Sequence, residues 1–288
     1  EAANFAEAQS LVFGIYESRE GRSKLYSDMN ALVLKYVIEA VAGSTFDEFL
    51  SREIFTPLGM FSTFGFVPYS KISLCVNYNY EHKIINDRYT INTEVPLGTP
   101  HDPKAKILRN NNNAIAGHAG IFSSIGDMAL FCQGLLKGRI IRQNMLSLIG
   151  MAHTGFIKAS GQYQQYMGLL CFSKSRVERF SEVPKWMHSN AFALSGYTGC
   201  HIAIDPVSGI FEVMLGNRCH NRVSLILPEN SFQNANLSKY GSGNVIWDNG
   251  RAVNSSVRYV YNKDSLLHKP VFNRLLQMGL FKRGEKLG

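Results

Sequence analysis

Residues 26–43 read YSDMNALVLKYVIEAVAG. Apolar side chains recur in this stretch at i, i+1, i+4, i+5, i+8 and i+9, a spacing that places them on one face of a helix. Gly43 suits the C-terminal end of such a helix. We therefore expect a helix that begins after Asp28 and buries the face formed by Leu32, Val33, Tyr36, Val37, Ala40 and Val41.

A second helix is expected directly after the first. Ser44 stands three residues before Asp47, the spacing of a helix cap, and an apolar helical pattern follows it. Pro57 is expected to stop this helix, because proline cannot continue the hydrogen-bond ladder. The sequence PLGM at 57–60 then indicates a packed turn.

The periodicity changes along the rest of the chain. Further helices are expected from Ser124, over 143–151 and over 264–280, and residues 205–209 (DPVSG) have the composition of a turn. Strands are expected near 72–80 and over 166–172, 198–204 and 210–215. Helices followed by antiparallel strands indicate an α+β fold in which the helices are segregated from the sheet.

The composition excludes several classes of protein. The chain has 288 residues, 45% apolar and 18% charged, which is enough for a real core and unlike a disordered chain. The net charge of +8 is scattered and accompanies no nucleic-acid-binding motif, so we expect no nucleic-acid partner. No run of ~18–20 apolar residues predicts a transmembrane segment. Neither the five cysteines nor the histidines have metal-ligand spacing, so neither a metal nor another cofactor is expected.

Three segments carry a resemblance to a known family. They are YSD at 26–28, with PLGM downstream; AGHAGIFSS at 116–124, preceded by HD at 101–102; and SGYTG at 195–199. In this order and spacing they resemble the serine β-lactamase-related family, which includes class C β-lactamases, DD-peptidases and related esterases. The resemblance runs from about residue 20 to 225. It implies a β-lactamase/transpeptidase-like fold and acyl transfer on a small-molecule or peptidoglycan-like substrate.

The resemblance also implies roles for individual residues. Tyr26 matches the tyrosine that takes a proton from the nucleophilic serine, a role that needs a cation nearby because phenols titrate near 10. Asp28 stands where the family has Asn. Ser195, Gly196 and Tyr197 match the strand that faces the substrate, where Leu194 replaces the family's cationic residue.

His118, in the second segment, has two readings. It is either a base in the site or a residue that fixes a tight turn through a hydrogen bond to the backbone. We favour the second, because the flanking glycines indicate a turn with close backbone approach.

The family's Ser-x-x-Lys nucleophile motif is missing: no serine in the sequence has lysine three residues later. We therefore expect an N-terminally truncated member that is inactive alone. The alternatives are a pseudoenzyme that keeps a binding scaffold, and the poorly folding product of a decayed gene. We expect one partial domain over 1–225, helical over about 26–160 and sheet over about 161–225, completed by a loop and helix over 226–288.

Truncation also bears on association and location. A sheet that lacks its first strands has an open edge through which copies of the chain can associate. By resemblance alone, the protein is expected to act in the periplasm or elsewhere outside the cytoplasmic membrane.

Overall fold

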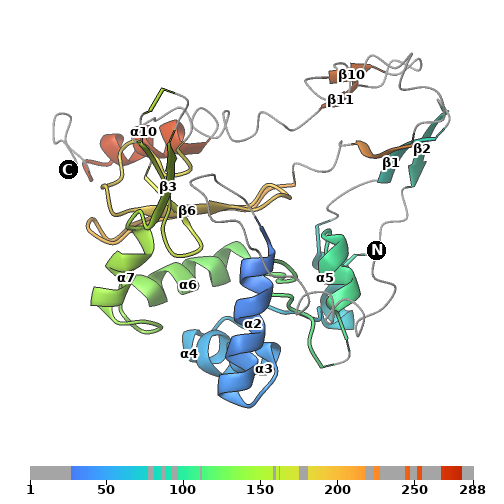
Figure 1. The fold of residues 1–288 in the computed structure, drawn as a ribbon, viewed down its shortest axis with the longest axis horizontal. Helices are drawn as coiled ribbons and strands as arrows, with labels where there is room; N and C mark the ends of the chain where they lie inside the picture. The colour runs from blue at the N-terminus through green and yellow to red at the C-terminus, as the bar shows by residue number, and fades with distance from the viewer. Residues whose placement is uncertain are drawn as a thin grey trace. The chain divides into compact units, whose positions relative to one another are not determined.

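The computed structural model describes residues 27–76, 81–85, 88–92, 97–110, 112–157, 160–161, 163–174, 181–217, 223–227, 244–246, 252–254 and 267–280. The chain divides into two compact units, which are described separately (Figure 1). The first comprises Glu1–Ser73, Gly98–Leu194 and Ile202–Val213, and the second comprises Leu74–Leu97, Ser195–His201 and Met214–Gly288. Among the described residues, no helix has the length and apolar character needed to cross a membrane.

The first predicted helix is confirmed as α2, Met29–Ala42. Gly43 ends it in the left-handed conformation at φ 62°, and its N–H bonds the carbonyl of Glu39 at 3.0 Å. A residue with a Cβ is strained at this φ, which is why glycine is suited to the position. The helix ends where the sequence predicts.

The predicted buried face of α2 is largely wrong, since only two of its six residues are buried. Leu32 and Tyr36 are buried, in a core with Ala105, Leu108 and Ala116, but Val33, Val37 and Val41 are 41%, 50% and 84% exposed. The helix is rotated so that a lysine shares the buried stripe. Hydrophobicity alone predicted the wrong face because the packing partners lie about 70 residues further along the chain.

That lysine, Lys35, is 1% exposed. Its Nζ lies 3.7 Å from Oε1 of Glu39 and 5.0 Å from the centre of the Tyr36 ring. Burial lowers the pKa of Lys35, and the Glu39 and Asp47 carboxylates oppose this effect. The paired carboxylate makes the buried ammonium tolerable.

The next helical segment is capped differently from the prediction. Helix α3, Phe46–Leu50, has Thr45 as its N-cap, in a capping box with Glu48, so the expected Ser44–Asp47 cap is wrong by one residue. The chain continues through a π-helical turn, Ser51–Phe55, into α4, Thr56–Leu58. Pro57 lies inside α4 and does not stop the helix; Gly59 ends it at φ 75°.

The strands expected near 72–80 are not found there. Residues Tyr69–Leu74 form a 3-10 helix, and 77–80 lie outside the described residues. Strands β1, Glu81–Ile85, and β2, Arg88–Asn92, follow instead. A short helix that the sequence did not reveal, α5, spans Pro103–Leu108.

After the helices described above, the main element of the first unit is a six-stranded sheet with the order β3-β4-β5-β6-β7-β8. Helices α6, Ile125–Leu136, and α7, Gln143–Gly150, confirm two predictions and pack against this sheet (Figure 1). Cys132 and Leu135 of α6 and Leu146 of α7 meet Phe192 and Ile204 of the strands in one core. The strands are β3 Thr154–Ile157, β4 Tyr163–Met167, β5 Phe172–Ser173, β6 Phe192–Ser195, β7 His201–Asp205 and β8 Ile210–Met214.

Two of the predicted strands differ from the structure in their bounds. The expected strand 166–172 corresponds to the end of β4 and the start of β5, with a turn between them, and the expected strand 198–204 begins too early. The strand expected over 210–215 is confirmed as β8. Helices packed against a largely antiparallel sheet confirm the α+β class.

The second unit contains a mixed sheet and the last helix. Its strand order is β2-β1-β9, with β9 at Val223–Leu227 parallel to β1. A further antiparallel pair joins β10, Asn244–Ile246, to β11, Ala252–Asn254. The expected closing helix is confirmed as α10, which is shorter than predicted at Lys269–Gln277.

Candidate functional site

The first motif segment leads into α2. Tyr26 lies outside the described residues, and Asp28 is the residue immediately before the helix. The Asp28 side chain does not cap α2. Its Oδ2 instead lies 3.0 Å from Nζ of Lys104 at the start of α5, so an ion pair holds the motif's third residue.

Asp102 joins this ion pair to the second motif segment. Its Oδ1 caps α5 by accepting a hydrogen bond from the N–H of Ala105 at 2.9 Å, and its Oδ2 accepts one from Lys104 at 3.2 Å. Nε2 of His118 lies 2.9 Å from the same Oδ1. Asp28, Lys104, Asp102 and His118 therefore form a continuous polar chain within the first unit, which we call the Asp28–His118 network.

The charges in this network support one another. Burial alone would raise the pKa of Asp102, but hydrogen bonds from His118, the Ala105 N–H and Lys104 hold it well below its usual range. Burial would likewise lower the pKa of Lys104, and its hydrogen bonds to the two carboxylates raise it instead. Both groups stay ionised at neutral pH.

The favoured interpretation of His118 predicts a hydrogen bond from its imidazole to the backbone, and this partner is wrong. The imidazole is bonded to the Asp102 carboxylate instead, and its side chain is 6% exposed. The expected tight turn is present: Gly117 and Gly120 have φ of 93° and 110°. A Cβ on Gly117 would lie 2.7 Å from the carbonyl oxygen of Ala31, so the turn packs directly against α2 and only glycine fits.

The network also contains donors that suit a metal ion. Ligand atoms of Asp28, Asp102 and His118 all lie within 4.8 Å of one another, a set that sequence spacing did not reveal. However, the Lys104 ammonium is hydrogen-bonded to both carboxylates and supplies positive charge at this position. The negative charges of the Asp28 and Asp102 carboxylates are therefore already balanced by the Lys104 ammonium.

The third motif segment lies in the second unit, at the turn between β6 and β7. Ser195 is the last residue of β6, and Gly196 and Tyr197 begin the turn. The Gly196 N–H donates to the Cys200 carbonyl at 2.7 Å and closes the turn. This places Ser195 beside the first residue of β7, His201, with Oγ of Ser195 2.8 Å from Nδ1 of His201.

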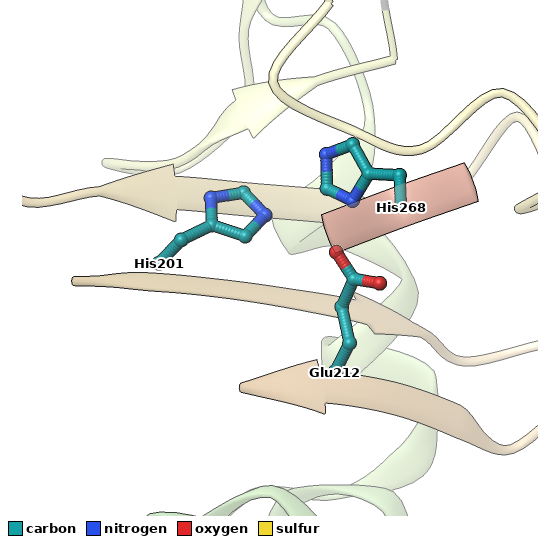
Figure 2. Close-up of side chains that lie close together, drawn as sticks. All are labelled: His201, Glu212 and His268. Carbon is teal, nitrogen blue, oxygen red and sulfur yellow. The ribbon is translucent and has the colours of Figure 1, made fainter. Parts of the chain in front are cut away.

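His201 is 1% exposed and packs against a second histidine of the same unit. The rings of His201 and His268 are edge to face, with centroids 5.2 Å apart and an interplanar angle of 63° (Figure 2). His268 immediately precedes α10 and is 3% exposed. Figure 2 also labels Glu212, a buried residue of β8 in the first unit.

Two residues that bond the predicted ones, Lys104 and His201, were not predicted from sequence. Lys104 lies in an unrecognised helix, so nothing indicated that it reaches Asp28. His201 could have been found: it and Ser195 flank a segment with Gly196 and Gly199, and residues that flank a tight turn between antiparallel strands face each other.

Comparison with known proteins identifies the class. Residues 16–229 match the family described as Beta-lactamase, a span that contains all three motif segments and more than half of the chain. The chain therefore belongs to the serine β-lactamase-related family. This confirms the resemblance and the β-lactamase/transpeptidase-like fold expected from it.

The chain is also similar to individual curated proteins. It is 27% identical over 214 residues to proteins of Escherichia coli O157:H7 and Salmonella typhi that are named "Putative D-alanyl-D-alanine carboxypeptidase". In each case the match covers 72% of this chain and 48% of the relative, so the chain spans about half the length of the curated relatives it matches.

Similar solved structures include a penicillin-binding protein homologue from Caulobacter crescentus, with 14% identity and a TM-score of 0.48, covering 68% of this chain and 53% of that one. Another is EstA from Arthrobacter nitroguajacolicus Rue61a, with 14% identity and a TM-score of 0.48, covering 74% and 63%.

Proposed function

We propose that this chain is the C-terminal portion of a β-lactamase-related serine hydrolase that transfers acyl groups from β-lactams, peptidoglycan peptides or esters. In this proposal the chain supplies Tyr26 and Asp28 to the catalytic site and His118, Ser195, Gly196 and Tyr197 to the substrate side. It does not acylate itself with β-lactams when it is alone.

The observation that carries the proposal is a family match that includes the tyrosine motif but no nucleophile. Residues 16–229 match the family, and no serine in the 288 residues has lysine three positions later. A serine hydroxyl is a weak nucleophile unless an adjacent base activates it, and in this family lysine and tyrosine share that task. The relatives, of which the chain spans about half, have room for that motif.

A second candidate is a catalytically dead scaffold that binds a ligand or a protein partner. One observation favours it: Leu194, at the position of the family's cationic residue, is 45% exposed on β6 and cannot pair with a substrate carboxylate. In this reading, the Asp28–His118 network keeps the scaffold in shape and has no part in proton transfer.

The test of the first candidate is acylation by a fluorescent penicillin. The isolated chain is expected to carry no covalent label after denaturing electrophoresis, whereas a class C β-lactamase run beside it is labelled. A stoichiometric adduct on the chain would contradict the proposal. Adding the missing half of a relative in trans distinguishes the two candidates, because only the hydrolase portion is expected to gain labelling.

A further inference from the structure

A serine and a histidine form a pair in the second unit that the family's mechanism does not use. Oγ of Ser195 lies 2.8 Å from Nδ1 of His201, within the 2.6–3.2 Å that nucleophile and base require. Ser195 is half-buried, whereas His201 is 1% exposed. Ser195 is therefore the more accessible residue of the pair.

The surroundings of the imidazole restrict its orientation. His201 is the first residue of β7, and the hydrogen bond from the Gly196 N–H to the Cys200 carbonyl fixes the turn that leads into it. The edge of the ring meets the ring of His268, with centroids 5.2 Å apart (Figure 2). The imidazole thus lies within hydrogen-bond reach of the Ser195 hydroxyl, which is the geometry that general-base catalysis needs.

We propose that Ser195 and His201 form a second nucleophilic dyad, which takes small uncharged activated esters. Oγ of Ser195 attacks the ester carbonyl carbon while Nδ1 of His201 takes the hydroxyl proton. The tetrahedral intermediate then breaks its bond to the leaving oxygen, which receives that proton from His201. Water attacks the acyl-serine next and loses a proton to Nδ1; the bond between the acyl carbon and Oγ then breaks, Oγ receives that proton from His201, and the carboxylic acid is released with the original Ser195 and neutral His201.

The preference for uncharged esters follows from the residues beside Ser195. Leu194, which precedes it in sequence, and Tyr197, which follows in the turn, are 45% and 51% exposed. Neither carries a charge that could pair with a substrate carboxylate. Exposed apolar side chains instead favour an aryl or short acyl group, whose burial is favourable by about 25 cal/mol per Å². The dyad does not depend on the function proposed above, because it needs neither Tyr26 nor a Ser-x-x-Lys motif.

The test is labelling of the full chain with an alkyl fluorophosphonate, which forms a P–O bond to an activated serine as the P–F bond breaks. Intact-mass spectrometry is expected to show one phosphonyl group per chain, and peptide mapping to place it on Ser195. Ser195→Ala is expected to abolish the label. The control Ser189→Ala removes an exposed serine whose Oγ lies 3.5 Å from Oδ1 of the neighbouring Asn190, and is expected to label like the wild type.

His201→Gln tests the base. The labelling rate is expected to fall by about 10²- to 10⁴-fold, the usual contribution of a general base, and thermal melting checks that the variant is folded. If it does not fold, Ser195→Ala still decides, since it removes one oxygen from a half-buried site. An unlabelled wild-type chain, a label on another residue, or labelling that survives Ser195→Ala would show that the pair only closes the turn. The two tests are independent. A penicillin adduct would contradict the proposed function, and an absence of fluorophosphonate labelling would contradict the dyad.

Discussion

At the scale of single residues, Asp205 is an unusually well-satisfied buried charge. It is 0% exposed, and its carboxylate accepts four hydrogen bonds. The backbone N–H and Nδ1 of His188 donate at 3.0 and 2.7 Å, and the backbone N–H groups of Val207 and Ser208 donate at 3.0 and 3.3 Å. One side chain therefore holds both the β7–β8 turn and a loop 17 residues earlier in the chain.

This arrangement predicts a large loss of stability on Asp205→Ala. The change leaves His188 and two turn amides without their acceptor, and leaving a buried donor without its acceptor costs about 1–3 kcal/mol. Asp205→Asn keeps the shape and one carbonyl-type acceptor, so its loss is expected to be smaller. Urea unfolding at pH 7 measures both; an Ala variant within ~0.5 kcal/mol of the wild type would contradict the assignment.

The pH dependence of Asp205 gives a further expected outcome. Burial opposes its ionisation, but the hydrogen bonds from His188 and from the Ser208 N–H lower its pKa below the usual value. A lowered pKa in the folded state means that the contribution is fully present above the unfolded pKa of about 3.9 and is lost as the pH falls through the folded pKa. The stability difference between wild type and Asp205→Asn is therefore expected to shrink between pH 5 and pH 2. A constant difference would show that the charge is not responsible.

At the scale of elements, the start of α3 offers a matched pair of variants. Oγ1 of Thr45 accepts from the Glu48 N–H, while the Glu48 side chain accepts from the Thr45 N–H. Thr45→Ala removes half of this capping box and is expected to cost about 1 kcal/mol. Ser44→Ala, one residue earlier, removes a hydroxyl that caps nothing and is expected to change the free energy of unfolding by less than ~0.5 kcal/mol. If Ser44→Ala lowered the melting temperature more than Thr45→Ala, Ser44 would be the N-cap, as expected from sequence.

The misplaced cap shows where sequence reasoning fails. Ser44–Asp47 and Thr45–Glu48 have the same spacing, so local pattern cannot choose between them. A distant contact chooses: Oδ1 of Asp47 accepts from the Ile115 N–H at 2.9 Å, and both its oxygens lie within 3.1 Å of the Ala114 N–H. Asp47 is therefore committed to another segment and is not available as a cap.

Elements whose signals are local were predicted well. Helix α6 begins as expected, since Ser124 accepts from the Asp127 N–H at 3.1 Å, and Gly43 ends α2. The face that α2 buries depends on partners far along the chain and was predicted only in part. The same holds for the candidate site. Motif residues Asp28, Asp102, His118 and Ser195 could be named from sequence, but the contact between Asp102 and His118 and the partners Lys104 and His201 follow from how the segments meet in space.

At the scale of the whole molecule, apolar surface and edge strands both favour association. Val33, Val37 and Val41 recur every four residues on α2 and are 41%, 50% and 84% exposed, which makes one apolar stripe along the helix. In the six-stranded sheet, β3 and β8 are the terminal strands. The net charge of +8 opposes contact between copies of the chain, and salt screens that repulsion.

We therefore expect the chain to self-associate reversibly, more strongly as salt is added, with the α2 stripe at the contact between two copies. Val37→Lys and Val41→Lys each place a charge in the stripe and are expected to shift sedimentation velocity profiles toward monomer without changing the thermal melt. Val207→Lys, at a turn position that is 60% exposed and outside the stripe, is the matched control and is expected to associate like the wild type apart from a small charge effect.

If the α2 variants left association unchanged, the contact between copies would instead lie at a sheet edge. A proline in the middle of β3 or β8 would then be the next variant to test. A wild-type chain that stays monomeric at every concentration and salt level would exclude both surfaces. At high salt the repulsion between copies is screened, so burial of the exposed stripe would then be expected to drive association.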